Sequence, residues 1–117
     1  MAVTVLAEVK INPGASEELA EYFEVTGPLL EAAGARIVSH LKVNETVIGK
    51  NSAKSMYVVE YPSRDAVFQV FTSESYKSII PARDLAFDLY QISICDSSGP
   101  DALSQSEAPD PLLKATR

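Results

Sequence analysis

The stretch MYVVEYPSRDAVFQVFTSESYKSIIPARDLAFDLYQISICD, residues 56–96, decides the fold of this chain. Its first residues predict a strand up to Tyr61, which a proline–serine pair ends. Apolar residues then recur at helical spacing as far as Phe71. After a polar Thr-Ser-Glu-Ser turn, residues 76–87 predict a helix in two pieces around a proline, and residues 88–96 predict a closing strand.

The residues before this stretch predict a helix and further strands. Apolar side chains alternate over residues 3–11, which is the period of a strand with one buried face. Ser16 is a suitable N-cap for the helix that follows, and Gly34 suits the left-handed position after its end. The second strand is expected over residues 35–48 and the third over residues 54–61.

The elements therefore follow the order βαββαβ, which the ferredoxin-like, split βαβ arrangement satisfies. We expect an α+β sandwich in which a four-stranded antiparallel sheet carries its helices on one face, with right-handed crossovers. The opposite face also carries apolar side chains, because both sides of the third strand are largely apolar. Such a sheet needs a second cover. We therefore expect two copies to pair through their sheets into a dimeric α/β barrel.

One domain is expected over residues 1–96, since a chain of 117 residues forms a single core. From residue 97 the composition changes to a Pro- and Ser-rich tail, residues 97–117, with too few apolar residues for a core of its own. Two leucines stand out in this polar segment. We expect Leu112 and Leu113 to pack on the neighbouring subunit.

Charge and cysteine content argue against several classes of protein. The formal charge is −6, with 16 acidic and 10 basic residues, which disfavours nucleic-acid binding. A single cysteine, Cys95, allows no internal disulfide and is typical of a cytoplasmic protein. Glu8 and Lys10 interrupt the apolar N-terminal run, so neither a signal peptide nor a membrane span is expected.

Several motifs together resemble a known family. They are VVEYPS at residues 58–63, Ala66, SESY at residues 73–76, and Arg83. Over residues 3–96 the chain resembles the domain-of-unknown-function family thirteen-thirty, within the dimeric α/β-barrel superfamily that also holds the antibiotic-biosynthesis monooxygenases. The resemblance implies the ferredoxin-like fold and a homodimer. It implies no particular reaction.

Arg83 is the first candidate for binding a ligand. It follows Tyr76 by seven residues, about two helical turns, so the two side chains can share a face. In one interpretation Arg83 binds a carboxylate or enolate of a small ligand, while Tyr76 donates a hydrogen bond to it. In the other, Arg83 is a structural residue that is paired with Glu60, Asp84 or a backbone carbonyl.

Glu60 and His40 are the candidate catalytic residues. Glu60 interrupts an apolar strand, so it acts either as a base in a pocket or as the partner of Arg83 or Lys10. His40, the one histidine, is either a proton shuttle or a surface residue. The expected strand gives it these neighbours on its face: Arg36, Val38 and Lys42.

Tyrosines complete the candidate site. Tyr22 is expected to bind substrate together with Tyr76 and Arg83, because the five tyrosines of the chain can line a phenolic cleft. Alternatively they are core residues whose hydroxyls lie at the rim. The five are Tyr22, Tyr57, Tyr61, Tyr76 and Tyr90.

No cofactor is expected. One histidine and one cysteine without closely spaced acids do not form a zinc or iron site, and the sequence has no phosphate-binding loop or nucleotide fingerprint. Two functions remain open: a cofactor-independent enzyme, monooxygenase- or isomerase-like, on a small acidic or aromatic metabolite, and a non-catalytic ligand-binding or structural dimer. An enzyme requires a cavity onto which Glu60 or His40 opens. A cavity below roughly 300 Å³ favours the second function.

Overall fold

A computed structural model describes residues 2–96 of the chain. Four strands and four helices follow one another in this part. They are β1 (Val3–Ile11), α1 (Ser16–Ala32), β2 (Arg36–Lys42), β3 (Ser55–Tyr61), α2 (Arg64–Phe71), α3 (Glu74–Ser78), α4 (Ile80–Ala86) and β4 (Phe87–Cys95). The tail predicted to dock through Leu112 and Leu113 lies outside the described residues.

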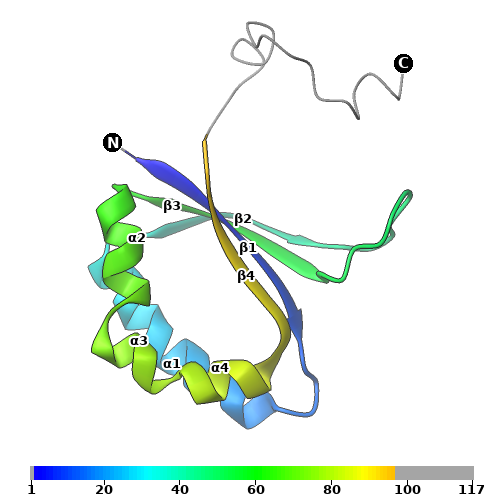
Figure 1. Cartoon of the computed structure of the whole chain (residues 1–117), viewed down its shortest axis with the longest axis horizontal. Helices are drawn as coiled ribbons and strands as arrows, with labels where there is room; N and C mark the ends of the chain where they lie inside the picture. Colours follow the sequence, from blue (N-terminus) through cyan, green and yellow to red (C-terminus); the bar gives the residue numbers. More distant parts are fainter. Residues whose placement is uncertain (1, 97–117) are drawn as a thin grey trace, which may run out of the picture.

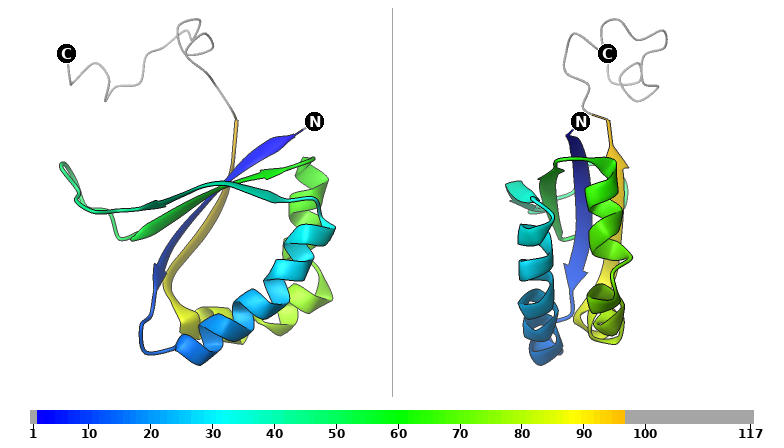
Figure 2. Two further views of the ribbon diagram at one scale, coloured as in Figure 1. Left: turned by 180° about the vertical axis from the view of Figure 1, so that it is seen from behind. Right: turned by 90° about the vertical axis from the view of Figure 1, so that its left-hand side faces the viewer.

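The four strands form one sheet in the order β2-β3-β1-β4, and all neighbours in it are antiparallel. The helices lie on one face of this twisted sheet, with α1 beside the run from α2 to α4 (Figures 1 and 2). The predicted ferredoxin-like α+β fold is therefore confirmed. No helix within residues 2–96 is long and apolar enough to cross a membrane.

Helix α1 begins differently from the prediction. Ala15 occupies the N-cap position without a side-chain cap, and Ser16 is the first helical residue. The preceding turn is held instead by Asn12, whose Oδ1 accepts a hydrogen bond from the Gly14 N–H at 3.0 Å and whose Nδ2 donates to the Leu85 carbonyl at 3.0 Å. These bonds fix the entry to the helix, so that a serine cap is not needed.

The end of α1 follows the prediction. Gly34 has a φ of +76°, the left-handed conformation that glycine adopts without strain. A Cβ at this position would also lie 3.2 Å from the Pro62 ring. The glycine thus turns the chain into β2 and allows close packing against the end of β3.

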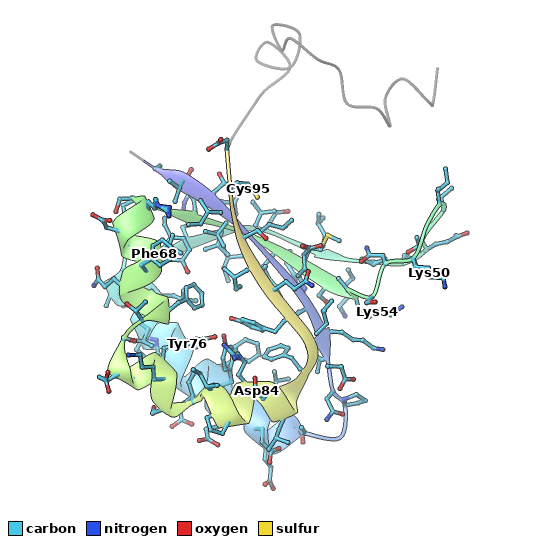
Figure 3. The ribbon with its side chains drawn as sticks, in the orientation of Figure 1. Lys50, Lys54, Phe68, Tyr76, Asp84 and Cys95 are labelled. Carbon is cyan, nitrogen blue, oxygen red and sulfur yellow. The ribbon has the colours of Figure 1, made fainter. Side chains whose placement is uncertain are left out.

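Strand β2 is shorter than predicted, because it ends at Lys42 rather than near residue 48. Lys42 already faces Ser55, the first residue of β3, so no strand remains opposite residues 43–48. The chain between the two strands projects away from the helices, with Lys50 near its tip (Figures 1 and 3). Val47 and Ile48 are 87% and 80% exposed there.

The two faces of the sheet differ in burial. Val5, Val9 and Val59 point toward the helices and belong to the main core. On the opposite face, Leu6 pairs with Val58 across β1 and β3, and both side chains are only partly buried. Apolar side chains on this uncovered face agree with the predicted pairing of two sheets, which stays a prediction.

Candidate functional site

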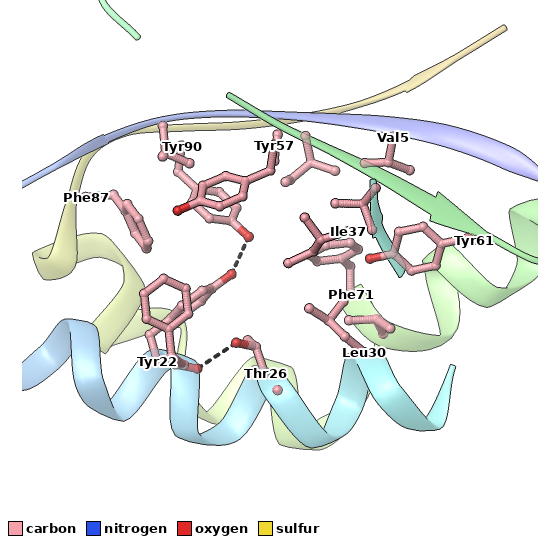
Figure 4. A pocket seen from close by; sticks show the side chains of 17 residues that line it. Val5, Tyr22, Thr26, Leu30, Ile37, Tyr57, Tyr61, Phe71, Phe87 and Tyr90 are labelled. Atoms are coloured by element: carbon pink, nitrogen blue, oxygen red, sulfur yellow. Dashed lines mark hydrogen bonds between the residues drawn. The ribbon is translucent and has the colours of Figure 1, made fainter. Parts of the chain in front are cut away.

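A cavity of about 280 Å³ lies between the sheet and the helices. Its wall is almost entirely apolar and comes from strands and helices alike, for example Val5, Leu30, Val59 and Phe71 (Figure 4). Phe23 on α1 and Ile37 on β2 also line it and are 47% and 56% exposed. The cavity is therefore reached between α1 and the edge strand β2.

Three tyrosine hydroxyls meet beside this cavity, of which Tyr22 and Tyr90 line it and Tyr76 lies behind them. Tyr22 comes from α1, Tyr76 from α3 and Tyr90 from β4. The Tyr22 hydroxyl lies 3.0 Å from that of Tyr76. It is also hydrogen-bonded to the Tyr90 hydroxyl (Figure 4). Tyr76 donates to the Tyr90 hydroxyl at 3.4 Å. We call these three residues the phenol triad.

Local structure holds each member of the triad. The Ser73 hydroxyl accepts a hydrogen bond from the Tyr76 N–H at 3.1 Å, which caps α3 and fixes the start of that short helix. The Tyr22 ring makes edge contacts with the rings of Tyr76, Tyr90 and Phe87 at centroid distances of 6.0, 5.7 and 5.3 Å. The hydroxyls are therefore positioned by packed rings rather than by mobile side chains.

The triad can donate one hydrogen bond into the cavity at low cost. Each phenol carries one proton. If Tyr76 donates to Tyr22 and Tyr22 donates to Tyr90, the proton of Tyr90 is free for an acceptor. Within the triad the Tyr90 proton could only be donated to the Tyr76 oxygen, across 3.4 Å, which is a longer separation than that between Tyr22 and Tyr76. An oxygen of a ligand competes with that weak bond alone.

Burial disfavours ionisation of two members of the triad, Tyr22 and Tyr90. Desolvation, followed by the charge of Tyr90 and a hydrogen bond to Tyr76, raises the pKa of Tyr22 well above its ordinary value. Desolvation also raises the pKa of Tyr90, although its hydrogen bond with Tyr22 and the charge of Arg83 act in the opposite direction. Both groups are therefore hydrogen-bond donors near neutral pH and not bases.

Arg83 on α4 supports the triad from outside the cavity. Its Nη1 donates to the Tyr76 hydroxyl at 3.3 Å, and its guanidinium lies 5.4 Å from the Tyr90 ring centroid. Nε and Nη2 donate to Asp84 Oδ1 at 3.3 and 3.2 Å. Burial lowers the pKa of Arg83, but bonds to Tyr76 and Asp84 outweigh burial and raise it, so the side chain is a cation.

Arg83 itself lines a second cavity of about 390 Å³. This cavity lies beyond a wall of Phe71, Tyr90 and Ile92 that both cavities share. Phe68 and Ile80 contribute to its sides. The predicted pairing of Arg83 with Tyr76 is thus present, but Arg83 acts on the inner cavity only through the tyrosines.

Glu60 lies away from this cluster. It projects from the opposite face of the sheet, and its Oε1 is 2.7 Å from Nη2 of Arg36. The pairing of Glu60 with Arg83 or Lys10 was therefore predicted wrongly, because Arg36 is its cross-strand neighbour. The catalytic role of Glu60 stays a prediction, although the residue does not line the cavity.

His40 lies on the helix-facing side of β2, at its exposed end. A register shift between Ile37 and Ser39 moves it opposite Tyr57, and the two rings stack at 4.1 Å. The predicted neighbourhood of His40 was therefore wrong in part, since Arg36 faces the other way. His40 is separated from the inner cavity by the Tyr57 ring, and its catalytic role stays a prediction.

Sequence reasoning placed five tyrosines in one cleft but chose only Tyr22 and Tyr76 among them for binding. Tyr90 completes the triad, and Tyr57 and Tyr61 line the inner cavity. The alternation of side chains along β3 and β4 could have indicated these three residues. Tyr57, Tyr61 and Tyr90 each lie opposite a valine or alanine of β1, on the face of the sheet that the helices cover. Within residues 2–96 no cluster of three or more acids, histidines and cysteines could hold a metal.

Comparisons with known proteins agree with this fold. The family model described as Domain of unknown function (DUF1330) matches residues 4–96. The RPA0582 protein of unknown function from Rhodopseudomonas palustris is similar in structure, with a TM-score of 0.72 and 20% identity over 85% of this chain and 84% of that one. No curated protein sequence matches.

Two other solved structures share the fold at lower similarity. SnoaB, a cofactor-independent oxygenase from Streptomyces nogalater, has a TM-score of 0.57 and 13% identity, with 84% of this chain and 94% of that one covered. A proposed antibiotic biosynthesis monooxygenase from Caulobacter crescentus has a TM-score of 0.54 and 17% identity, with 84% and 91% covered. At these identities the likeness establishes the fold alone.

Proposed function

We propose that this chain, which belongs to the family described as Domain of unknown function (DUF1330), binds a small aromatic or otherwise apolar molecule through one enol, phenol or carboxyl oxygen. The observation that carries this proposal is a hydrogen-bonded phenol triad beside an apolar cavity, with the Arg83 cation behind it. The apolar wall binds the body of the ligand, and the triad binds its oxygen.

The arrangement suits an oxygen on which negative charge develops. Tyr90 donates its free proton in a site with an almost entirely apolar wall, where a hydrogen bond to an anion is strong. Arg83 donates to Tyr76 and polarises its hydroxyl, which strengthens the one hydrogen bond that Tyr76 donates within the triad. An enolate or phenolate is therefore stabilised without any cofactor.

Cofactor-independent chemistry on such an anion, monooxygenase- or isomerase-like, is the enzymatic form of this proposal. The shared fold of SnoaB supports it. The lining residues of the inner cavity within residues 2–96 include no carboxylate or imidazole, so the ligand itself has to be acidic enough to lose its proton to water. We expect the protein to act as a homodimer, with the partly buried apolar residues Leu6 and Val58 in the interface between sheets.

A non-catalytic or structural dimer is the second candidate. The size of the inner cavity favours it, since about 280 Å³ is just below the usual range of ligand pockets. Arg83 is paired with Asp84, one of the partners that a structural role predicted, whereas its pairing with Glu60 is absent. Ligand binding distinguishes the two candidates.

The test is a thermal-shift and calorimetric screen of the wild-type protein against phenols, enolisable ketones and small carboxylates. A ligand at a hundred times its dissociation constant should stabilise the protein by about 2.7 kcal/mol. Arg83→Ala should weaken binding of the same ligand, whereas the matched variant Arg36→Ala, on the opposite face, should not. Failure of every compound class at millimolar concentration would favour the structural dimer. Oxygen uptake with each bound ligand then tests for turnover.

A further inference from the structure

Tyr61 presents a hydroxyl that packing alone does not explain. The residue is 2% exposed and lines the inner cavity, and Figure 4 shows its hydroxyl directed into that space. Among residues 2–96 no hydrogen bond to this hydroxyl is formed. No fully enclosed side-chain oxygen or nitrogen within residues 2–96 lacks a partner, so the Tyr61 hydroxyl is open to the space of the cavity, where an acceptor atom can reach it.

The charge state of Tyr61 defines what it can bind. Burial, followed by the charge of Tyr76, raises the pKa of Tyr61 to about 12. The hydroxyl is therefore neutral at physiological pH and has one proton to donate. Its proper partner is an acceptor atom, such as a carbonyl oxygen.

Strand register separates Tyr61 from the triad. Tyr61 lies opposite Val3 of β1, whereas Tyr90 lies opposite Val9. The two rings are therefore attached to the sheet at positions six residues apart along β1. The Tyr61 ring and the pair formed by Tyr22 and Tyr90 accordingly enter the cavity from opposite sides (Figure 4).

We propose that Tyr61 is a second polar anchor, which selects ligands with a carbonyl oxygen at the end remote from the phenol triad. The preferred ligand is then flat and apolar, with an acidic hydroxyl at one end and a carbonyl at the other. This inference rests on the proposed function, because it names the class of molecule that the same cavity accepts. It adds specificity that the triad cannot supply, since the triad addresses one end of the ligand only.

The experiment compares three probes by calorimetry: a naphthol, an acetylnaphthalene, and a naphthol that carries an acetyl group on its far ring. The wild-type protein should bind the doubly substituted probe about tenfold more tightly than the naphthol, as expected for one added hydrogen bond. Tyr61→Phe should remove this preference and leave naphthol binding unchanged. Its melting temperature should stay the same or rise, because no hydrogen bond within the protein is lost.

Tyr57→Phe is the matched control. It removes a hydroxyl from the same strand and the same cavity wall, but Tyr57 is partly exposed and stacks on His40. The tenfold preference should survive in this variant. Equal affinities of the wild type for naphthol and its acetyl derivative, or equal losses in Tyr57→Phe and Tyr61→Phe, would overturn the role of Tyr61 alone. Absence of binding by all three probes would overturn the proposed function as well.

Discussion

The two faces of the sheet carry polar groups of opposite kinds. On the helix side, the three phenols of the triad are hydrogen-bonded to one another, and burial raises the pKa values of Tyr22 and Tyr90. On the other side, Arg36 and Glu60 form a charged pair whose side chains are 71% and 43% exposed. Burial penalises charge far more than it penalises a hydrogen-bonded hydroxyl. The buried face can therefore donate hydrogen bonds to an anion, while the acid–base groups remain in water.

The largest effect is expected when the triad loses a whole ring. Tyr22 is 4% exposed and packs against Phe23, Tyr76, Phe87 and Tyr90. Tyr22→Ala should lower the free energy of unfolding by about 3–5 kcal/mol, as for other large-to-small changes in a core. Urea denaturation measures this loss.

The control for Tyr22→Ala is Phe68→Ala. Phe68 is also an aromatic residue on a helix, but it is 44% exposed. Its replacement should cost far less than that of Tyr22. Similar losses in both variants would contradict the view that the triad belongs to the packed core.

The next largest effect is expected at alkaline pH, where the stability of the protein depends on the phenols on the helix side of the sheet. Tyr22 and Tyr90 have raised pKa values in the folded protein, so the unfolded chain loses these protons first. Stability is then fully present below pH 10, the ordinary tyrosine pKa, and falls above it. The slope is about 1.4 kcal/mol per pH unit for each phenol that stays protonated.

Denaturation curves between pH 8 and pH 11, with tyrosinate absorbance recorded in parallel, measure this slope. Tyr90→Phe should flatten the curve, because one of the retained protons is gone. Stability that is constant up to pH 11 would show that the phenols titrate normally and are not shielded from water.

A smaller effect is expected from removal of one hydroxyl. Tyr22→Phe keeps the ring but leaves the Tyr76 and Tyr90 hydroxyls without their shared partner. The expected loss is about 0.5–1.5 kcal/mol, the net contribution of a hydrogen bond, because Tyr76 keeps its bonds with Tyr90 and Arg83. Tyr61→Phe removes a hydroxyl from the same buried layer but breaks no bond within residues 2–96, so it should cost nothing. A thermal melt of the two variants side by side makes the comparison.

Sequence patterns predicted the fold well, because alternation along the strands and the βαββαβ order leave few arrangements. They could not predict which polar residues share a face. A single shift in register between Ile37 and Ser39 turned Arg36 toward Glu60 and His40 toward Tyr57. Local sequence patterns could not predict the triad either. Its members come from α1, α3 and β4 and meet only through tertiary packing.

The smallest effect is expected on the outer face. Glu60→Gln removes the charge that pairs with Arg36 at 2.7 Å, but both side chains are substantially exposed. Exposed ion pairs contribute about 0–1 kcal/mol, and less at high salt. The unfolding free energy should therefore change by less than about 1 kcal/mol, and the change should shrink further in 1 M salt.

The same variant, Glu60→Gln, also tests whether Glu60 contributes to ligand binding or to turnover. The residue does not line the inner cavity, so binding of a phenolic ligand should match that of the wild type within experimental error. Because Gln keeps the size of the side chain and removes only its charge, a loss of turnover at unchanged affinity would identify Glu60 as a base after all. Water or a second subunit would then have to connect Glu60 with the ligand on the other face of the sheet. The separation of the phenol donors on the helix side from the exposed acid on the other side would no longer describe the chemistry of this fold.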